Sequence, residues 1–181
     1  MLKVDRSEQK LWTNRLKPSG QGSHDKEHFS EWWLRNSSSL LNLHPLICEQ
    51  WIYRHWHYSP WAFLPLRKLS WKLSELGTDE IIDNVYRVFA TTLHPEYDFR
   101  VFNPENSNQL PTARPFSDTG TWDYPILTLE TPNGVDDGFN QIPDAKLCLI
   151  EGHQRHRYLN ALKHRGIRTG PHKMFILTLN E

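Results

Sequence analysis

Apolar positions predict a series of short strands and helices along the second two thirds of the chain. Four consecutive apolar residues at 147–150 predict a buried strand that ends close to Gly152. Beyond this glycine, Leu159 and Leu162 recur at helical spacing. We therefore expect a strand over 147–150, a glycine turn, and a helix that starts within two residues of Gly152.

Three further strands follow from apolar runs and partial alternation: one that starts after Pro65 within 64–73, one at 124–130 and one at 173–179. We expect the strand at 124–130 to pair with the strand at 147–150, because a turn region rich in Gly, Asp and Pro joins them. Thr78 is a candidate helix cap, and the acids after it suit the positive first turn of a helix. The apolar face of this helix, which extends to about Leu93, would contain Ile81, Ile82, Val85 and Phe89.

The other segments are less regular. Residues 1–28 are polar, and we interpret them as a flexible N-terminal arm. Residues 29–63 predict a helical, aromatic-rich extension before the domain formed by 64–181. Residues 94–121 are rich in Pro, Asn, Ser and Thr, which predicts a long loop with one short strand near 99–102.

The aromatic block at 51–61 allows three interpretations. Packing in the core is favoured, because aromatic rings contribute strongly to burial. A platform for stacked bases would need exposed rings beside basic groups. A metal site would use Cys48, His55 and His57, but a third ligand at a typical spacing is missing.

Composition changes this picture through charge. The chain has 181 residues, 21 basic and 21 acidic, so its net charge is zero and uniform attraction to nucleic acid is not implied. However, residues 152–180 contain six Lys or Arg and no acid, whereas 130–151 contain five acids and one lysine. This segregation predicts either a basic groove at the helix after Gly152 or opposite charges that face each other across the fold.

Cysteine usage and hydropathy bear on the compartment. Two cysteines one hundred residues apart give neither a disulfide framework nor a Cys-x-x-Cys metal pair, which fits a reducing cytoplasm. The N-terminus is too polar for a signal peptide, and no apolar run has the length of a transmembrane segment. We expect a cytoplasmic protein.

The junction at Gly152 predicts an anion site. The first turn of a helix has amide groups without intrahelical partners, and a glycine lets a phosphate approach the backbone. Arg155 and Arg157 add guanidinium groups that match phosphate oxygens, and Glu151 could hold a metal ion, a ribose hydroxyl or a water. His153 is a candidate general acid or base. The alternative is a surface helix with solvated arginines.

The sequence around Gly152 resembles a known motif. An apolar strand, an acid, Gly-His, and an arginine three places after the glycine resemble the Gly-x-x-Arg motif of the ParB and sulfiredoxin superfamily, with Gly152 and Arg155 at its two fixed positions. A slip of two residues would make Arg157 the motif arginine instead. No cysteine stands inside the motif, which argues against sulfiredoxin chemistry. Tyr124 and Pro125 begin a segment that is similar to the strand lining the nucleotide pocket in that superfamily.

The resemblance implies an α+β fold, with a small mixed sheet and packed helices over 64–181. It also implies ATP or CTP as ligand, with a divalent metal such as Mg²⁺. The implied roles are metal and catalysis for Glu151, catalysis for His153 and Arg155, and nucleotide binding for Tyr124, Pro125, Gly152, His153, Gln154, Arg155 and Arg157.

We expect a nucleotide-binding phosphohydrolase, an ATPase that also cleaves DNA, similar in organisation to plasmid-borne members of the superfamily that inhibit fertility. DNA would contact the basic residues Arg157, Lys163, Arg165 and Arg168. Two alternatives stay open: a nucleotide switch without chemistry that binds DNA or a protein, or a kinase of serine or another small metabolite. The aromatic extension is the candidate surface for a protein partner.

Overall fold

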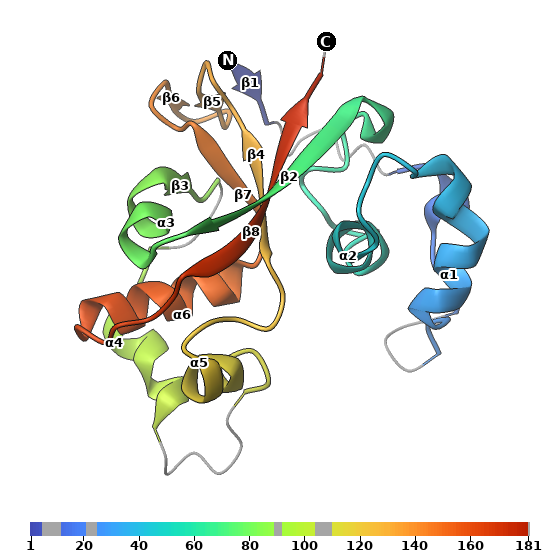
Figure 1. The fold of residues 1–181 in the computed structure, drawn as a ribbon. Helices are drawn as coiled ribbons and strands as arrows, with labels where there is room; N and C mark the ends of the chain where they lie inside the picture. The colour runs from blue at the N-terminus through green and yellow to red at the C-terminus, as the bar shows by residue number, and fades with distance from the viewer. Residues whose placement is uncertain (5–11, 21–24, 89–91, 104–109, 181) are drawn as a thin grey trace.

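The computed structural model describes residues 1–4, 12–20, 25–88, 92–103 and 110–180, which form a mixed α+β fold. A five-stranded sheet lies between two helical layers (Figure 1). Its strands, in spatial order, are β2 (Leu69–Leu76), β8 (His172–Leu179), β4 (Ile126–Glu130), β7 (Leu147–Glu151) and β3 (Val85–Tyr86). A small second sheet contains β1 (Leu2–Lys3), β5 (Val135–Asp136) and β6 (Gln141–Ile142).

Short helices make up most of both layers. The α-helices are α1 (Phe29–Asn36), α2 (Pro45–Ile47), α3 (Thr78–Asn84), α4 (Pro95–Asp98), α5 (Arg114–Thr119) and α6 (His153–His164). A π-helical segment, η3 (Cys48–Tyr53), continues α2. The 3-10 turns are η1 (Asn14–Leu16), η2 (Ser37–Ser39), η4 (Leu66–Lys68) and η5 (Phe99–Phe102).

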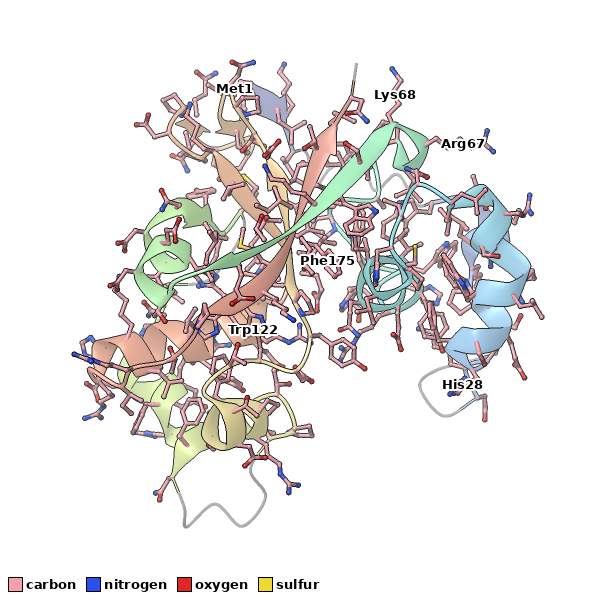
Figure 2. All side chains as sticks on the ribbon, viewed as in Figure 1. Met1, His28, Arg67, Lys68, Trp122 and Phe175 are labelled. Atoms are coloured by element: carbon pink, nitrogen blue, oxygen red, sulfur yellow. The ribbon has the colours of Figure 1, made fainter. Side chains whose placement is uncertain are left out.

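The central strands are buried on both faces. Along β7, Leu149 belongs to the cluster beneath α3 and α6, whereas its neighbours Cys148 and Ile150 belong to the cluster shared with the aromatic extension. Along β8, Phe175 points toward α2 (Figure 2), and its ring centroid lies 5.2 Å from that of His44. Because both faces need apolar side chains, these strands read as continuous apolar runs rather than as alternating ones.

The main sequence predictions for the sheet are confirmed. A strand ends at Glu151 and a helix begins at His153, directly after Gly152. β4 and β7 pair antiparallel as expected. The closing strand is β8, which pairs with β4 in parallel and with β2 in antiparallel orientation. The early strand begins at Leu69, since a 3-10 turn occupies the residues directly after Pro65.

The predicted helix from Thr78 to Leu93 is wrong in its second half. α3 ends at Asn84, and the chain then forms β3, which pairs in parallel with β7. Val85 therefore lies in the sheet, because strand pairing outweighs the helical spacing of its apolar residues. Phe89 lies outside the described residues. The cap position is held by Gly77, and the Thr78 hydroxyl instead lies 2.8 Å from the hydroxyl of Thr169.

The predicted strand near 99–102 is also wrong, and the segment 94–121 is not a plain loop. It contains α4, the 3-10 turn η5 and α5. The apolar side chains of η5 pack on α6, where the rings of Phe102 and Tyr158 are 5.8 Å apart. A single turn is enough to place such a run of apolar residues against a helix, so no strand partner is required.

The described part of residues 1–28 is packed, in contrast to the expected flexible arm. β1 pairs with β5, and Val4 is fully buried. Trp12 and Leu16 are also buried, and the Trp12 ring meets Trp51 edge-on with centroids 5.3 Å apart. These large apolar side chains lie in a polar segment, so their burial depends on the aromatic extension rather than on local periodicity.

The aromatic extension packs as the favoured interpretation predicts. Its fully or nearly fully buried tryptophans are Trp32, Trp51, Trp56 and Trp61. They form one apolar cluster with Leu127, Phe175 and Leu177 of the sheet. Within the described residues, no group of three His, Cys, Asp or Glu side chains could hold a metal ion. The described helices include none that is long and apolar enough to cross a membrane.

We expect Trp32→Ala to lower the free energy of unfolding by about 3–5 kcal/mol, the usual cost of removing a buried aromatic ring. The Trp32 ring is fully buried, and its Nε1 donates a hydrogen bond to the Leu16 carbonyl at 2.8 Å. Leu34→Ala is the matched control, because Leu34 lies on the same helix with 84% of its surface exposed. Denaturant unfolding would contradict a shared core if Trp32→Ala changed stability no more than Leu34→Ala.

Candidate active site at the start of α6

The turn between β7 and α6 requires glycine for two reasons. Gly152 has a φ of 101°, in the left-handed region that side chains disfavour. A Cβ atom added there would also lie 2.5 Å from Cγ2 of Ile126 on β4. Both the close approach to Ile126 and the backbone conformation of Gly152 therefore exclude a side chain at this position. The chain can therefore leave the buried strand and enter the helix with no intervening loop.

Glu151 is the last residue of β7 and its side chain is largely buried. Its Oε2 lies 3.2 Å from Nε2 of His55, a contact that is an ion pair when the imidazole is protonated. Burial raises the pKa of the Glu151 carboxyl, but His55, the Gly152 backbone N–H and the Arg155 charge lower it by more. The pKa therefore lies below its ordinary value, and the group is a carboxylate at neutral pH.

Arg155 points into the structure rather than toward solvent. The residue is 5% exposed, and its Nε donates to Asp123 Oδ1 at 3.2 Å. Its Nη2 donates to Oε1 of Gln50 on η3 at 3.3 Å, and its guanidinium lies 5.8 Å from the ring centroid of Tyr124. One side chain thus joins α6, the segment before β4 and the aromatic extension. A phosphate could reach this guanidinium only in competition with Asp123.

His153 and His156 lie one turn apart on α6, and Arg87 acts electrostatically on both. Burial lowers the pKa of His153, the charges of Arg87 and His55 lower it further, and Glu151 opposes them. His156 is 2% exposed, and burial followed by the charges of Arg87 and His153 lowers its pKa to about 3. Neither ring nitrogen of His156 has a hydrogen-bond partner among the described residues. Both imidazoles are neutral at pH 7.

The remaining candidate nucleotide-binding residues surround this turn. Tyr124 and Pro125 are half-buried just before β4, which neighbours β7 in the sheet. Gln154 is exposed, and its Oε1 accepts a long hydrogen bond from the Thr112 hydroxyl at 3.4 Å. The structure therefore brings Tyr124, Glu151, Gly152, His153 and Arg155 to one end of β7.

The basic residues of α6 face acids from the preceding helices. Arg157 pairs with the buried Asp98, with its Nε 3.1 Å from Oδ2. Lys163 Nζ lies 3.0 Å from Asp79 and 2.8 Å from Asp83. Arg165 pairs with Glu96 of α4. Of the four candidate DNA-binding residues, Arg157, Lys163 and Arg165 are thus neutralised in pairs, whereas Arg168 is exposed in the turn after α6. The acids in these pairs come from 79–98 rather than from the acidic run at 130–151, and they favour opposite charges facing each other across the fold over a basic groove along α6.

A divalent ion such as Mg²⁺ fits this site only with help from a ligand. The described residues supply no cage of three His, Cys, Asp or Glu side chains. Mg²⁺ commonly takes one or two carboxylates and completes its octahedron with waters and substrate phosphates. The ionised Glu151 is suited to be such a carboxylate.

Several residues of the site had no sequence signal. Gln50, His55, Arg87, Asp98 and Asp123 are distant in the chain and match no motif. The sequence offers His55 as a metal ligand together with Cys48 and His57, whereas in the structure its Nε2 lies beside Glu151. Each of these residues meets the site through the tertiary fold, which a short motif cannot reveal.

Comparisons of the chain with models of protein families, with curated proteins and with solved structures found no match.

The buried histidines make stability depend on pH. The pKa of His156 is lowered to about 3 and that of His172, which is fully buried, to about 4, both chiefly by burial. Because the unfolded chain binds protons more readily, stability is present above the unfolded pKa of about 6.5 and is lost as pH falls toward the folded values. Each histidine should cost about 2 kcal/mol at pH 5 relative to pH 7.5.

Denaturant unfolding at both pH values measures this loss. His156→Gln should reduce the difference between pH 7.5 and pH 5, whereas His57→Gln, which changes an exposed ring, should leave it as in the original protein. Equal stability of the original protein at the two pH values would contradict neutral burial of these imidazoles.

Proposed function

We propose that the protein binds a nucleoside triphosphate, ATP or CTP, at the start of α6 and hydrolyses it. The observation that carries this proposal is the turn at Gly152, where a buried strand ends and a helix of twelve residues begins. The Glu151 carboxylate precedes this glycine and the neutral imidazole of His153 follows it. The proposed relationship to the ParB and sulfiredoxin superfamily predicts the same placement, with β4 beside β7.

The backbone supplies the phosphate-binding groups in this proposal. The first amides of α6 lack intrahelical acceptors, and the helix dipole is positive at this end. A phosphate here would meet the N–H groups of the first turn of α6, which begins directly after Gly152. Neutral His153 can donate a hydrogen bond to a phosphate oxygen without the desolvation cost of a buried charge.

Glu151 and His153 have different roles in the proposed hydrolysis. The Glu151 carboxylate accepts a hydrogen bond from the attacking water or holds the metal ion, and His55 and the Gly152 N–H keep it ionised and oriented. His153, with its lowered pKa, can accept the proton that the water loses. A divalent ion held by Glu151 would neutralise charge on the phosphate oxygens.

Arg155 enters the proposal as a positioning residue that can exchange partners. Its charge lies near the first turn of α6, yet Asp123 and Gln50 hold it in the described structure. If phosphate draws the guanidinium away from Asp123, Gln50 of η3 loses one of its two donors and keeps only the long hydrogen bond from Arg54 Nη1 at 3.4 Å. Nucleotide binding would then be coupled to the aromatic extension.

This coupling favours a second candidate, a nucleotide switch that performs no hydrolysis. Both Glu151 and Arg155 contact the extension, through His55 and Gln50. Occupancy of the site would thereby change the packing of a region that could contact a protein partner. Lys163 and Arg165 are held in ion pairs with acids of the protein, which makes DNA a less favoured ligand than a nucleotide. DNA cleavage is therefore an extension of the proposal: it requires that Arg168 contacts DNA and that DNA phosphates replace the acids in these ion pairs.

We predict that Glu151→Gln lowers nucleotide turnover by at least about 100-fold and changes nucleotide affinity little, because the shape remains and the charge is lost. Phosphate release and calorimetric titration would measure the two quantities. Glu130→Gln is the matched control, since Glu130 ends the neighbouring strand β4 and pairs with Lys72 instead.

Three outcomes separate the candidates. Phosphate release by the original protein that is lost in Glu151→Gln supports the hydrolase. Nucleotide binding without phosphate release, with several divalent metals tried, rejects the hydrolase in favour of the switch. Absence of nucleotide binding by the folded protein contradicts both candidates.

A further inference from the structure

The outer strand β2 presents an unusually open edge. β2 lies at the end of the five-stranded order and has eight residues, Leu69 to Leu76, all of which pair with β8 without a shift in register. Its sequence contains neither proline nor glycine. Leu73 is 49% exposed and Trp71 is 37% exposed. An open edge of this length with apolar side chains is a template for pairing with another strand.

The free hydrogen-bonding groups of this edge can be assigned. The Asn180 N–H donates to the Lys68 carbonyl, so Lys68 and every second residue after it face β8. The backbone groups of Trp71, Leu73 and Glu75 therefore point outward. The Leu69 carbonyl, which also points outward, accepts from Asn42 Nδ2 at 2.7 Å and closes that end of the edge.

Natural edges usually carry features that prevent such pairing, such as a bulge, a proline or a charged side chain. The lysine of β2 provides little protection. Lys72 Nζ lies 2.8 Å from Glu130 Oε1 and is drawn over the sheet by this ion pair. The edge is thus left with two exposed apolar residues and with backbone groups that have no partner among the described residues.

Charge along β2 has opposite sign at its two ends. Arg67 and Lys68 precede the strand and project from the molecule (Figure 2). Glu75 lies near its end, and the exposed Asp79 and Glu80 follow at the start of α3. An antiparallel copy of the same strand would place each basic end beside an acidic end. The edge is therefore complementary to itself in charge.

We propose that two copies of this chain associate by antiparallel pairing of their β2 strands across a two-fold axis. The sheet would continue through the axis as a ten-stranded sheet with the same face of each copy on the same side. Such a self-complementary contact forms a closed dimer and removes the open edge.

The side chains favour a register with Leu73 on the axis. Leu73 would then oppose Leu73 of the partner subunit, with Trp71 diagonal to it on the same face. Lys72 would oppose Ser74 of the partner subunit. A register one step away, with Lys72 on the axis, would set two like charges directly opposite each other, which destabilises a strand pair.

A cysteine substitution tests this register directly. In a hydrogen-bonded antiparallel pair the two Cα atoms lie about 5.5 Å apart, which is within the range that a disulfide spans. Leu73→Cys should form a covalent dimer under mild oxidation. Leu34→Cys on α1, where the residue is 84% exposed, should not. The two native cysteines are buried, so they do not obscure the result.

Sedimentation equilibrium then measures the association itself. Leu73→Lys should raise the dimer dissociation constant at least about tenfold, equivalent to about 1.4 kcal/mol, whereas Leu34→Lys should leave it unchanged. Circular dichroism would verify that the variants fold. The proposal is overturned if the original protein is monomeric at its highest soluble concentration. It is equally overturned if a dimer persists unchanged in Leu73→Lys and no disulfide forms through Leu73→Cys.

Discussion

The left-handed turn at Gly152 is the constraint on which the arrangement of the molecule depends. A buried strand must end there and a helix must begin at once, while the backbone passes so close to Ile126 that no Cβ atom fits. α6 therefore begins directly beside β4, where the chain leaves β7. The direction of α6 in turn brings Arg155 to Asp123 and Gln50 and sets Glu151 beside His55. The same turn thus determines both the core packing and the candidate site.

The five-stranded sheet imposes a second constraint, because both of its faces are apolar and must be covered. α3 and α6 cover one face, and the tryptophan-rich extension covers the other. The extension is therefore part of the same folded unit as the sheet, and its contacts with Glu151 and Arg155 follow from that packing. If the extension only presented exposed aromatic rings to a ligand, it would not contact Glu151 and Arg155.

Local patterns in the sequence predict a helix whose apolar side chains line one face and a strand whose residues form one buried apolar run. The strand at 147–150, the following helix and the last strand all agree with the structure. Prediction fails where a distant partner decides. Val85 fits a helical face but pairs with Leu147, and Phe102 fits a strand but packs on Tyr158. Local spacing contains no information about either partner.

The candidate site divides in the same way. Gly152, Glu151 and His153 are adjacent in the chain, so a motif can indicate them. The partners that set their properties come from positions 50, 55, 87 and 123, and they shift pKa values or occupy donors in ways that a short motif does not encode. The charge pattern shows the limit most clearly. Lys163 reads as part of a basic run, yet it pairs with Asp79 and Asp83 of α3.

The central claim is that nucleotide phosphates bind at the first turn of α6, and amide NMR tests it most directly. Titration of the ¹⁵N-labelled protein with a non-hydrolysable ATP or CTP analogue and Mg²⁺ should shift the amide signals of His153 and Gln154 most strongly, because these N–H groups would gain phosphate acceptors. Smaller shifts should follow at Gln50 and His55 as Arg155 and Glu151 respond. Saturable binding whose largest shifts lie elsewhere, with the Gly152 turn unaffected, would contradict the account.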